Sequence, residues 1–538
     1  MSEIIKTPVL IVGAGPVGIA TAIDLGQRGI PCILLEKSDG TIEHPRTGLV
    51  AIRTMEAFRK WGFSERVRQC GFPDDYELSM VFCTSLNGFL LDREYYPPMG
   101  QTPTPEQTPE HKQRCPQLWL QPIMADVAHD TTGVTPMYEH QFESLNDDGN
   151  VVRSTVTDLK TGQTRIIESQ YVVACDGAMS GIREQIGIAM SGKLLSYSIN
   201  VLLRIPGFNT SHIMGQAERY LCVGPNGTWG NFTVVDGNEI WRLTVVGSEE
   251  KMDLNTFDPG AYVRKAFGRD DIEFEVESII PWRRSEMLAD QFSKGRVILC
   301  GDALHTMSPT GGMGMNTGIQ DALDIGWKLQ ALIEGWGGPR LLESYEIERR
   351  PVARRNIDFS TANFSAWKDA PDAALVLEDT PEGEAARKAL GAHMRAGTRV
   401  EWDCVGLQIG YRYDDSPIVV PDGTQLPPGD NSLYVQTGRP GARAPHAWLE
   451  DGRSTLDLFG NEYTIVAFED ANHSEIENLH RALIKIGAPV VVRHINDQKI
   501  AALYGGAIVL VRPDGHVCWR GAVLTDPDKV AATVTGNL

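Results

Sequence analysis

Two glycine-rich segments, far apart in the chain, contain residues whose types and spacing suit a nucleotide cofactor. The first is Gly13-Ala14-Gly15-Pro16-Val17-Gly18. The second begins at Gly301-Asp302 and continues at Gly311-Gly312-Met313-Gly314-Met315-Asn316. Glycines at such spacing permit a tight turn and a close approach of the backbone to a phosphate, whereas either segment alone is also compatible with a simple turn.

The first segment lies inside a predicted βαβ unit. The apolar run Val9–Val12 is typical of a buried parallel strand, residues 17–28 have helical periodicity, and residues 33–36 form the next strand. The first amides of that helix would bind phosphates, and an acid at the end of the second strand would accept hydrogen bonds from a ribose. These features predict a dinucleotide, without separating FAD from NAD, bound by Gly13, Gly15, Pro16, Val17, Gly18, Glu36 and Lys37.

The second segment favours a flavin. The apolar stretch Arg296–Cys300 predicts a buried strand, and the acid directly after it would present a carboxylate to the ribityl chain, which a nicotinamide nucleotide lacks. A helix that begins near residue 312 would stabilise the negative charge that reduced flavin carries at N1 and C2=O. We therefore expect FAD, bound in this segment by Asp302, Gly312, Gly314, Met315 and Asn316.

Patterns along the chain predict an α/β protein whose cofactor domain is interrupted by an inserted sheet. Apolar runs at 220–223, 228–235 and 239–246, separated by turn residues, predict an antiparallel meander. The expected divisions are 1–189 for the first part of a Rossmann-like FAD-binding domain, 190–282 for the inserted β-sheet substrate domain, 283–370 for the second part of the FAD-binding domain with its helices, 371–424 for a connector, and 425–538 for a C-terminal α/β domain.

Three further stretches carry local predictions. Pro97–Pro116 has no periodicity and predicts a long surface loop or lid. Pro351 predicts a kink or break in the helix of residues 340–364, because proline removes a helical hydrogen bond. In the last domain we expect strands at 463–468, 489–492 and 507–511 and a helix at 474–486.

Composition argues against several kinds of partner. The chain of 538 residues has a formal net charge of −20, which does not suit a surface for nucleic acid. No apolar stretch reaches the roughly 20 residues that span a bilayer, so no membrane association is expected. The nine cysteines are scattered without a close CxxC pair, which predicts neither a disulfide framework nor a metal site and suits a cytoplasmic protein.

Further motifs give the chain a resemblance to a known family. They are His44-Pro45-Arg46, Arg53-Thr54-Met55-Glu56, Gln121, Asp176-Gly177-Ala178-Met179-Ser180-Gly181-Ile182-Arg183, and Asp321-Ala322 with Trp327-Lys328-Leu329. Together with the glycine-rich segments, these motifs resemble those of the FAD-dependent aromatic hydroxylases, the single-component flavoprotein monooxygenases of the phenol and polyketide hydroxylase type. The resemblance covers nearly the whole chain. It implies that Arg46, Gln121 and Asp302 contact FAD and that Asp176 lies near its pyrophosphate.

The last domain resembles the thioredoxin-like domain of the larger family members, through residues 441–446 and 511–520. Thiol redox chemistry needs a CxxC pair after a strand, and the residues after Phe468 are Glu469-Asp470-Ala471-Asn472-His473. We therefore expect a structural role or a dimer contact for this domain, and a homodimer is the assembly that such a contact would form.

The resemblance implies a reaction sequence. NADPH or NADH reduces FAD, the reduced flavin adds O2 to form a C4a-hydroperoxide, and the distal oxygen passes to a carbon of a small aromatic substrate. The backbone carbonyl of Pro309 would face that hydroperoxide, although the segment Leu304–Pro309 departs from the second alanine and paired prolines of many members. His305 in this segment is either an acid–base group or a local hydrogen-bonding residue.

The predicted meander supplies the candidates for the substrate pocket. Arg204, Tyr220 and Arg242, with His212 ranked below them, could lower the pKa of a phenol or accept its proton, since phenolate is the better nucleophile. Trp229, Phe232 and Trp241 could line a pocket for an aromatic ring. For all of these residues the alternative is a surface or packing role, because one face of a sheet points away from the pocket.

A second enzyme class stays open, a flavin halogenase or dehydrogenase with the same fold. A halogenase would be expected to carry a Trp-x-Trp-x-x-Pro segment and an active-site lysine, and the nearest feature, Pro281-Trp282-Arg283-Arg284, does not match. The residues therefore favour an aromatic hydroxylase over this alternative.

Overall fold

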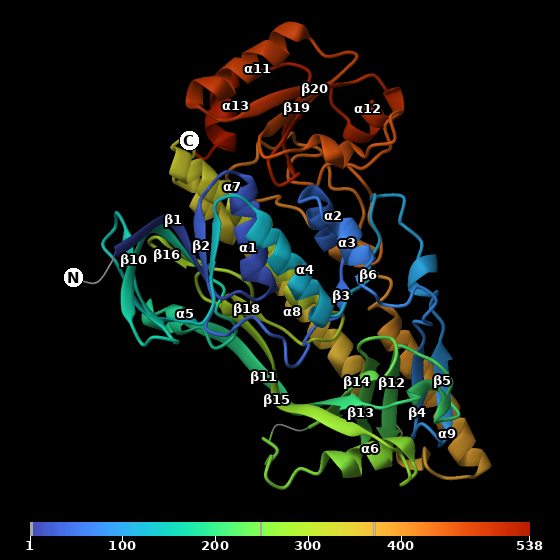
Figure 1. Cartoon of the computed structure of the whole chain (residues 1–538). Coiled ribbons are helices and arrows are strands. Elements are labelled where there is room, and N and C mark those ends of the chain that lie inside the picture. Colours follow the sequence, from blue (N-terminus) through green and yellow to red (C-terminus); the bar gives the residue numbers. More distant parts are fainter. Residues whose placement is uncertain (1–3, 248–249, 369–370, 372) are drawn as a thin grey trace.

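The computed structural model describes residues 4–247, 250–368, 371 and 373–538, which form three stacked bodies (Figure 1). A central α/β body carries the N-terminus. A large, mostly antiparallel sheet lies on one side of it, at the bottom of Figure 1, and a small C-terminal α/β domain lies on the opposite side. The α/β class and the inserted sheet expected from the sequence are thereby confirmed.

The central sheet contains the predicted βαβ unit. Its strands follow the order β16-β17-β10-β1-β2-β7, and β1, β2, β7, β10 and β17 pair in parallel. Their bounds are β1 Ile4–Val12, β2 Cys32–Leu35, β7 Val134–Met137, β10 Thr164–Ala174, β16 Ser293–Lys294 and β17 Val297–Leu299, with β8 His140–Asp147 and β9 Val152–Asp158 alongside. Helix α1 (Pro16–Gln27) packs on α4 (Gln117–Asp130) and α7 (Met313–Glu334), so residues 9–12 are buried as a parallel strand requires.

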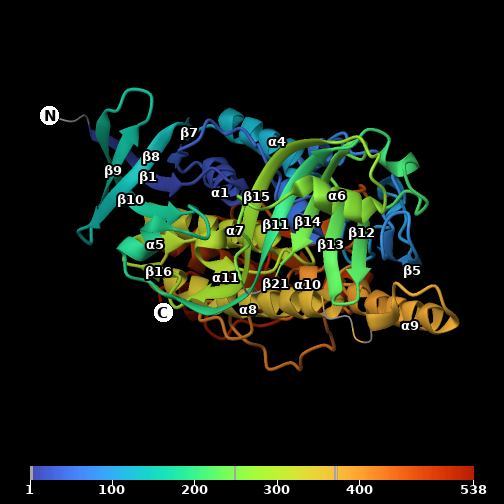
Figure 2. The same cartoon turned by 90° about the horizontal axis from the view of Figure 1, so that it is seen from below.

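The second sheet is larger than the predicted meander. Its order is β18-β15-β11-β14-β13-β12-β4-β5. The bounds are β4 Met80–Cys83, β5 Leu90–Glu94, β11 Met190–Arg204, β12 Arg219–Gly224, β13 Gly227–Val234, β14 Ile240–Val246, β15 Glu275–Ala289 and β18 His305–Thr306. The three predicted strands are β12, β13 and β14. The long strands β11 and β15 pair along their lengths and run from the central body into this sheet (Figures 1 and 2).

The strand pairing places two segments differently from the expected division of the chain. Strand β4 pairs with β12 in parallel and with β5 in an antiparallel ladder, so residues 80–94 belong to the inserted sheet although they precede residue 190. Strand β15 continues to Ala289, beyond the expected boundary at 282. Helix α6 (Pro259–Phe267) covers one face of the sheet and buries a cluster that includes Phe208 and Trp241, whose rings stack at 3.6 Å.

The long helix α8 (Arg340–Lys368) excludes a break at Pro351, which was one of the two outcomes expected there. The helix continues through this proline, and Val352 and Ala353 directly after it are buried. The packing of its buried face offsets the hydrogen bond that proline removes. Helix α9 (Pro381–Arg399) then packs against β5, so the expected connector also supports the inserted sheet. In the described part of the chain, no helix combines the length and apolar character needed to cross a membrane.

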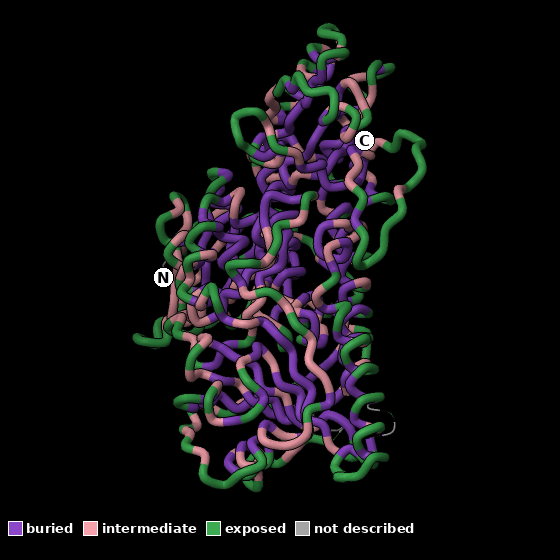
Figure 3. Tube along the Cα trace, turned by 90° about the vertical axis from the view of Figure 1, so that its right-hand side faces the viewer, coloured by how far each residue is buried: buried purple, intermediate pink, exposed green. Residues whose placement is uncertain are grey.

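The C-terminal domain has the sheet order β20-β19-β21-β22. Its elements are β19 Tyr463–Phe468, α11 His473–Ile486, β20 Val490–Ile495, α12 Gln498–Tyr504, β21 Ile508–Val511, β22 Val517–Gly521 and α13 Pro527–Val534. The predicted strands and helix correspond to β19, β20, β21 and α11, whereas β22, α12 and α13 were not expected. Buried residues are found in the interior of this domain, as they are in the other two bodies (Figure 3).

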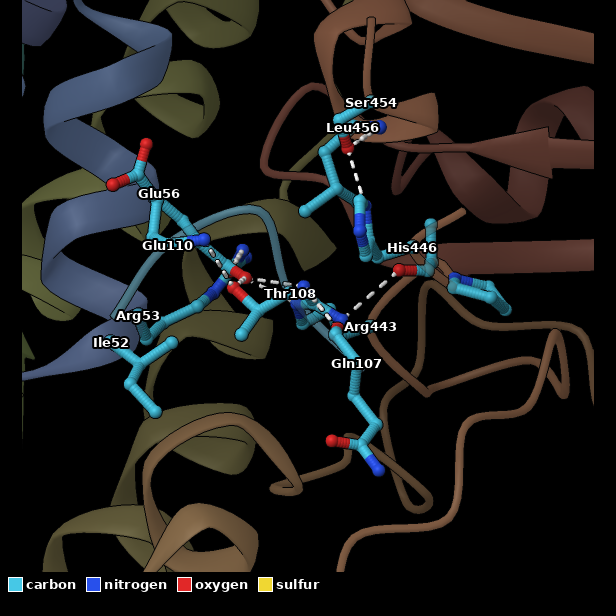
Figure 4. Close-up of polar contacts among 12 residues, drawn as sticks. Ile52, Arg53, Glu56, Gln107, Thr108, Glu110, Arg443, His446, Ser454 and Leu456 are labelled. Carbon is cyan, nitrogen blue, oxygen red and sulfur yellow. Dashed lines mark hydrogen bonds and ion pairs between the residues drawn. The ribbon is translucent and has the colours of Figure 1, made fainter. Parts of the chain in front are cut away.

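A buried ion-pair cluster joins the C-terminal domain to helix α2 (Ile52–Lys60) and to the segment 97–116 (Figure 4). Arg443 donates to both carboxylate oxygens of Glu56, with an Nε–Oε2 distance of 2.9 Å, and to the carbonyl oxygen of Gln107 at 3.2 Å. Glu56 also accepts from Arg53 at 2.9 Å and from the hydroxyl of Thr108 at 2.6 Å. These bonds hold the centre of segment 97–116, which was expected to be a loop or lid, against α2 and the C-terminal domain.

We predict that Glu56→Gln lowers the free energy of unfolding by about 3–5 kcal/mol at pH 7, because Arg53 and Arg443 would stay buried without their counter-charge. Burial alone raises the pKa of Glu56, but the two guanidinium groups outweigh it and lower the pKa from 4.5 to about 2. A depressed pKa stabilises the fold above pH 4.5, and this contribution is lost as the pH falls toward 2.

Thermal unfolding of wild type and variant, followed by circular dichroism, measures the effect. The difference in Tm should be large at pH 7 and should shrink between pH 5 and pH 3. Glu65→Gln removes an exposed carboxylate that pairs with Arg68 and is the control, with little expected change. A difference in Tm that is small at pH 7, or that is constant across this range, contradicts the prediction.

Candidate active site

The turn between β1 and α1 is closely packed on one side and open on the other. A Cβ atom at Gly13 would lie 2.3 Å from the carbonyl oxygen of Cys175, and one at Gly18 would lie 1.8 Å from the carbonyl oxygen of Gly13. A Cβ atom at Gly15 would meet no protein atom within 4 Å. Pro16 begins α1, where its missing amide costs no helical bond. The remaining amides at this helix start suit a pyrophosphate.

Glu36 lies directly beside this turn. Its Oε2 accepts a hydrogen bond from the amide of Ala14 at 2.8 Å, and its Oε1 accepts from the amide and hydroxyl of Ser38 at 2.9 Å. The carboxylate is therefore fixed at the end of β2, where further hydrogen bonds from ribose hydroxyls can reach it. Lys37 is exposed next to it.

Two carboxylates follow the neighbouring strands β10 and β17. Asp176 accepts from the amide of Ile182 at 3.2 Å, whereas its second oxygen is buried without a partner among the described residues. Asp302 is reached by solvent, yet burial by the surrounding protein raises its pKa. Burial likewise raises the pKa of Asp176. Asp176 thus has a buried oxygen atom without a partner, and Asp302 a carboxylate that solvent reaches, and both are available to a ribityl or diphosphate-linked cofactor.

The N-terminus of α7 is uncapped. Gly312 precedes the helix with a φ of +67°, and no side chain bonds to the first amides, which begin at Met313. The Asn316 side chain accepts from the amide of Ala51 at 2.8 Å and donates to the carbonyl oxygens of Leu49 and Gly312. Asn316 therefore fixes this turn, while the backbone amides of the first helical turn are free for a flavin with negative charge.

Arg46 and Gln121 are connected to the glycine turn by a chain of hydrogen bonds. The amide of Arg46 donates to Gln117, Gln117 donates to Gln121 at 2.9 Å, and Gln121 donates to the carbonyl oxygen of Ala14 at 3.3 Å. The guanidinium group of Arg46 is exposed. These bonds bring Arg46 and Gln121, two of the expected FAD contacts, to the glycine turn.

A cavity adjoins this region and extends to the inserted sheet. Its empty space is about 960 Å³, a volume that includes the open solvent at its mouth. Four parts of the chain form its walls. The cofactor side contributes Pro45, Arg46, Thr47, Gly48, Leu49, Pro309, Gly311 and Gly312, and the segment 97–116 contributes Met99, Lys112, Arg114 and Pro116. The inserted sheet and the residues next to its strands contribute Leu78, Glu218, Arg219, Thr233, Val234, Val235 and Arg242, and the connector contributes Glu401 and Trp402.

Of the six pocket candidates in the meander, Arg242 lines this cavity. Tyr220, Phe232 and Trp241 do not, because they are fully buried in the cluster under α6. Alternation along a strand explains this result, since Trp241 points to the α6 face and Arg242 to the opposite face.

The two remaining candidates also lie away from the cavity. Arg204 forms exposed ion pairs with Glu239 and Glu277. Trp229 lies under the ammonium group of Lys265, 4.0 Å from the ring centroid. His305 is fully buried, with its Nε2 2.7 Å from Asp321, and this arrangement supports the local hydrogen-bonding role over the acid–base one.

Several cavity residues were missed by the sequence reading. Arg219, Thr233 and Arg242 are direct neighbours across β12, β13 and β14, so they form a row on the cavity face. The position of Arg219 beside Tyr220, on the opposite face of the strand, was the signal that could have identified it. Lys112, Arg114, Glu401 and Trp402 lie in segments without periodicity, and nothing local marks them as cavity residues.

The fold and the two joined half-sites define a flavoprotein with a Rossmann-like FAD-binding domain. Family comparison agrees, because residues 6–360 match the model of the FAD binding domain and residues 437–537 match that of the C-terminal domain of aromatic-ring hydroxylases. The chain belongs to the FAD-dependent aromatic-ring hydroxylase family and is an FAD-dependent monooxygenase.

Relatives and solved structures support this assignment. The chain is 32% identical to 2,4-dichlorophenol 6-monooxygenase of Delftia acidovorans, over 96% of this chain and 95% of that protein. It is 30% identical to phenol 2-monooxygenase of Pseudomonas sp. (strain EST1001), over 98% and 92%. A structure of RebC soaked with chromopyrrolic acid and containing 7-carboxy-K252c has a TM-score of 0.92 and 37% identity, with all of both chains covered. The flavin-dependent monooxygenase PieE, in complex with FAD and substrate, has a TM-score of 0.88 and 28% identity, covering 99% of this chain and all of the other.

We predict that Gly18→Ala weakens FAD binding by roughly tenfold or more, because the new methyl group cannot lie 1.8 Å from a backbone oxygen without opening the turn. The ratio of flavin to protein absorbance after gel filtration measures retained FAD. Gly230→Ala is the control, since its Cβ atom would meet only ordinary contacts at 3.6 Å and beyond on β13. Equal flavin retention in the two variants would show that the turn tolerates the methyl group.

Proposed function

We propose that the enzyme hydroxylates a phenolic or related aromatic substrate with NAD(P)H and O2, in the cavity between the cofactor half-sites and the inserted sheet. The observation that carries this proposal is the composition of the cavity wall, where Pro309, Gly311 and Gly312 from the flavin side face the same space as Thr233 and Arg242 from the sheet. A substrate in this space would lie between the flavin ring and a polar sheet face.

The residues present fit FAD. Gly15 and the start of α1 suit its pyrophosphate, Glu36 its ribose, Asp302 its ribityl chain, and the uncapped amides of α7 its isoalloxazine ring. When bound and reduced by NAD(P)H, FAD supplies the electrons with which one atom of O2 is inserted into an aromatic C–H bond.

The chain's own residues would then orient the substrate and control its charge. The amides of α7 stabilise negative charge on the cofactor side, and Pro309 borders the space where the ring would lie. Cationic groups on the wall favour the ionised form of a bound phenol, because an opposite charge nearby lowers its pKa. Arg242 is placed to do this, since it lines the cavity.

The reductant and the surroundings of the enzyme are further parts of the proposal. NADPH or NADH would approach near Asp176 and Arg183, whose guanidinium donates to the carbonyl oxygen of Ala303 at 2.9 Å. We keep the expectations of a cytoplasmic location, a homodimer, and no nucleic-acid or membrane partner as predictions. Free cysteines throughout the described chain suit a reducing compartment.

We predict that a phenolic substrate accelerates flavin reduction by NAD(P)H and acquires one oxygen atom from O2. Stopped-flow absorbance of the flavin measures the reduction rate, and mass spectrometry of the product made under ¹⁸O₂ measures the transfer. A dehydrogenase of the same fold would oxidise its substrate without incorporating the label, and a halogenase would need halide. Formation of only hydrogen peroxide with every phenol tested would refute the hydroxylase function.

A further inference from the structure

We propose that Cys70 and Cys115 form a redox pair, which hydrogen peroxide converts to a disulfide, and that this bond locks one wall of the cavity. Cys70 follows α3 (Ser64–Arg68), and Cys115 lies in the segment 97–116. The inference goes beyond the proposed function, because it assigns a modification site to side chains that take no part in hydroxylation.

The two thiols of the redox pair are in direct contact. The Sγ atom of Cys70 donates a hydrogen bond to the carbonyl oxygen of Arg114 at 3.5 Å, and its thiol also forms a hydrogen bond with the thiol of Cys115. A disulfide would shorten the distance between the two sulfur atoms to about 2.05 Å. Because the side chains are already neighbours, the bond needs a local shift and no change of fold.

The two cysteines differ in access and in acidity. Cys115 is fully buried, whereas Cys70 is half-buried. The hydrogen bond with Cys115, assisted by the amide of Phe72, lowers the pKa of Cys70 from 9.0 to about 7, although burial and the carboxylate of Asp74 oppose this shift. The same hydrogen bond and burial raise the pKa of Cys115, against the charge of Arg114. Cys70 is therefore the thiolate that meets an oxidant first, and Cys115 is the thiol behind it.

The reaction balances with one molecule of hydrogen peroxide. The thiolate of Cys70 attacks one peroxide oxygen, the O–O bond breaks, and the departing hydroxide takes a proton to become water, which leaves a sulfenic acid on Cys70. The sulfur of Cys115 then attacks the sulfur of Cys70, the S–O bond breaks, and the second hydroxide takes the proton of Cys115. Two thiols lose two electrons and two protons, and two molecules of water form.

The oxidant is available at the enzyme itself. An enzyme that activates O2 on a flavin forms hydrogen peroxide whenever the oxygen is reduced without reaching a substrate. The thiols of a reducing compartment would restore the pair afterwards, so the modification is reversible.

Two other pairs of neighbouring cysteines are less accessible than the redox pair. Cys83 and Cys222 are opposite each other on β4 and β12, and both are fully buried. Cys300 is fully buried beside Cys175, whose Cβ atom would lie 3.3 Å from a Cβ atom at Gly18, so these two cysteines lie under the glycine turn of the FAD site. An oxidant reaches the redox pair from solvent without crossing the core or the cofactor site.

The redox pair adjoins the cavity. Arg114 and Pro116, on either side of Cys115, both line the cavity. The amide of Cys115 donates to the carbonyl oxygen of Gly48, which lines the cavity too. A disulfide would join this wall to the end of α3 by a covalent bond in place of a thiol hydrogen bond. Because a cross-link removes open states of a segment, oxidation should make local opening of residues 112–117 rarer.

Peptide mass spectrometry tests the bond. Reduced holoenzyme is treated with hydrogen peroxide, free thiols are alkylated, and the protein is digested with trypsin and a protease that cleaves after glutamate, since cleavage at Glu77 separates Cys70 from Cys83. We expect a peptide in which Cys70 is linked to Cys115 and which dithiothreitol removes. Its rate of formation should rise about tenfold between pH 6 and pH 8 and little above pH 8, as the thiolate fraction does for a pKa of about 7.

Three variants test the two roles. Cys70→Ser removes the attacking thiolate and should give no cross-link between these segments. Cys115→Ser keeps the thiolate and should accumulate a sulfenic acid at Cys70, which dimedone traps. Cys222→Ala removes a buried thiol of another pair and is the control, with the cross-link formed as in wild type. Flavin content and circular dichroism of the same samples show that each variant is folded.

Hydrogen exchange followed by mass spectrometry tests the effect on the cavity wall. The amides of residues 112–117 should exchange several-fold more slowly in the oxidised holoenzyme than in the reduced one, because the cross-link opposes local opening. Dithiothreitol should restore the faster exchange. Peroxide should leave the exchange of Cys70→Ser unchanged in this segment.

Three results would overturn the proposal. They are the absence of the cross-linked peptide in wild type, a rate of formation that keeps rising steeply above pH 8, and an exchange of residues 112–117 that is as fast in the oxidised enzyme as in the reduced one. Neither measurement uses a substrate or turnover, so a failure of hydroxylation and a failure of this inference are separate results.

Discussion

The close approach of three backbone segments around Val17 is the contact on which the site depends. A Cβ atom at Gly301 would lie 3.0 Å from this side chain, and one at Gly318 would lie 2.5 Å from it. Val17 is in the first turn of α1, Gly301 follows β17, and Gly318 is in α7, so glycine at both positions allows the two halves of the FAD site to meet. A larger residue at either position would separate the helix that faces the pyrophosphate from the helix that faces the flavin ring.

The parts of the fold that could be predicted are those encoded by neighbouring residues. The unit from Val9 to Glu36, the meander and most of the C-terminal elements follow from local periodicity and turn residues. The pairing of β4 with β12 could not be predicted, because it joins residues far apart in the chain and neither strand differs from an ordinary buried strand. At Pro351 the helix does not break, because packing of a long helix outweighed the local preference of proline.

The site residues fall into the same two groups, those encoded by neighbouring residues and those that depend on contacts between distant segments. The glycines, Glu36 and Asp302 belong to motifs with a local mechanism, and the structure brings them to one region. The substrate cavity instead depends on which face of the sheet helix α6 covers. Side chains alternate between the two faces along each strand, and the sequence does not say which of the two sets lines the cavity. Trp241 and Arg242 are adjacent, and the aromatic residue was the more attractive candidate for a ring-binding wall, although only the arginine reaches the cavity.

The segment 97–116 belongs to two bodies at once. Through Met99, Lys112 and Arg114 it forms part of the cavity wall, and through Gln107 and Thr108 it joins the cluster of Glu56 and Arg443. The C-terminal domain and the cavity wall are therefore connected through this segment. A chimera that exchanges the last domain alone would separate Arg443 from Glu56 and Gln107, so an exchange that keeps these contacts has to include this segment and α2 together with the C-terminal domain.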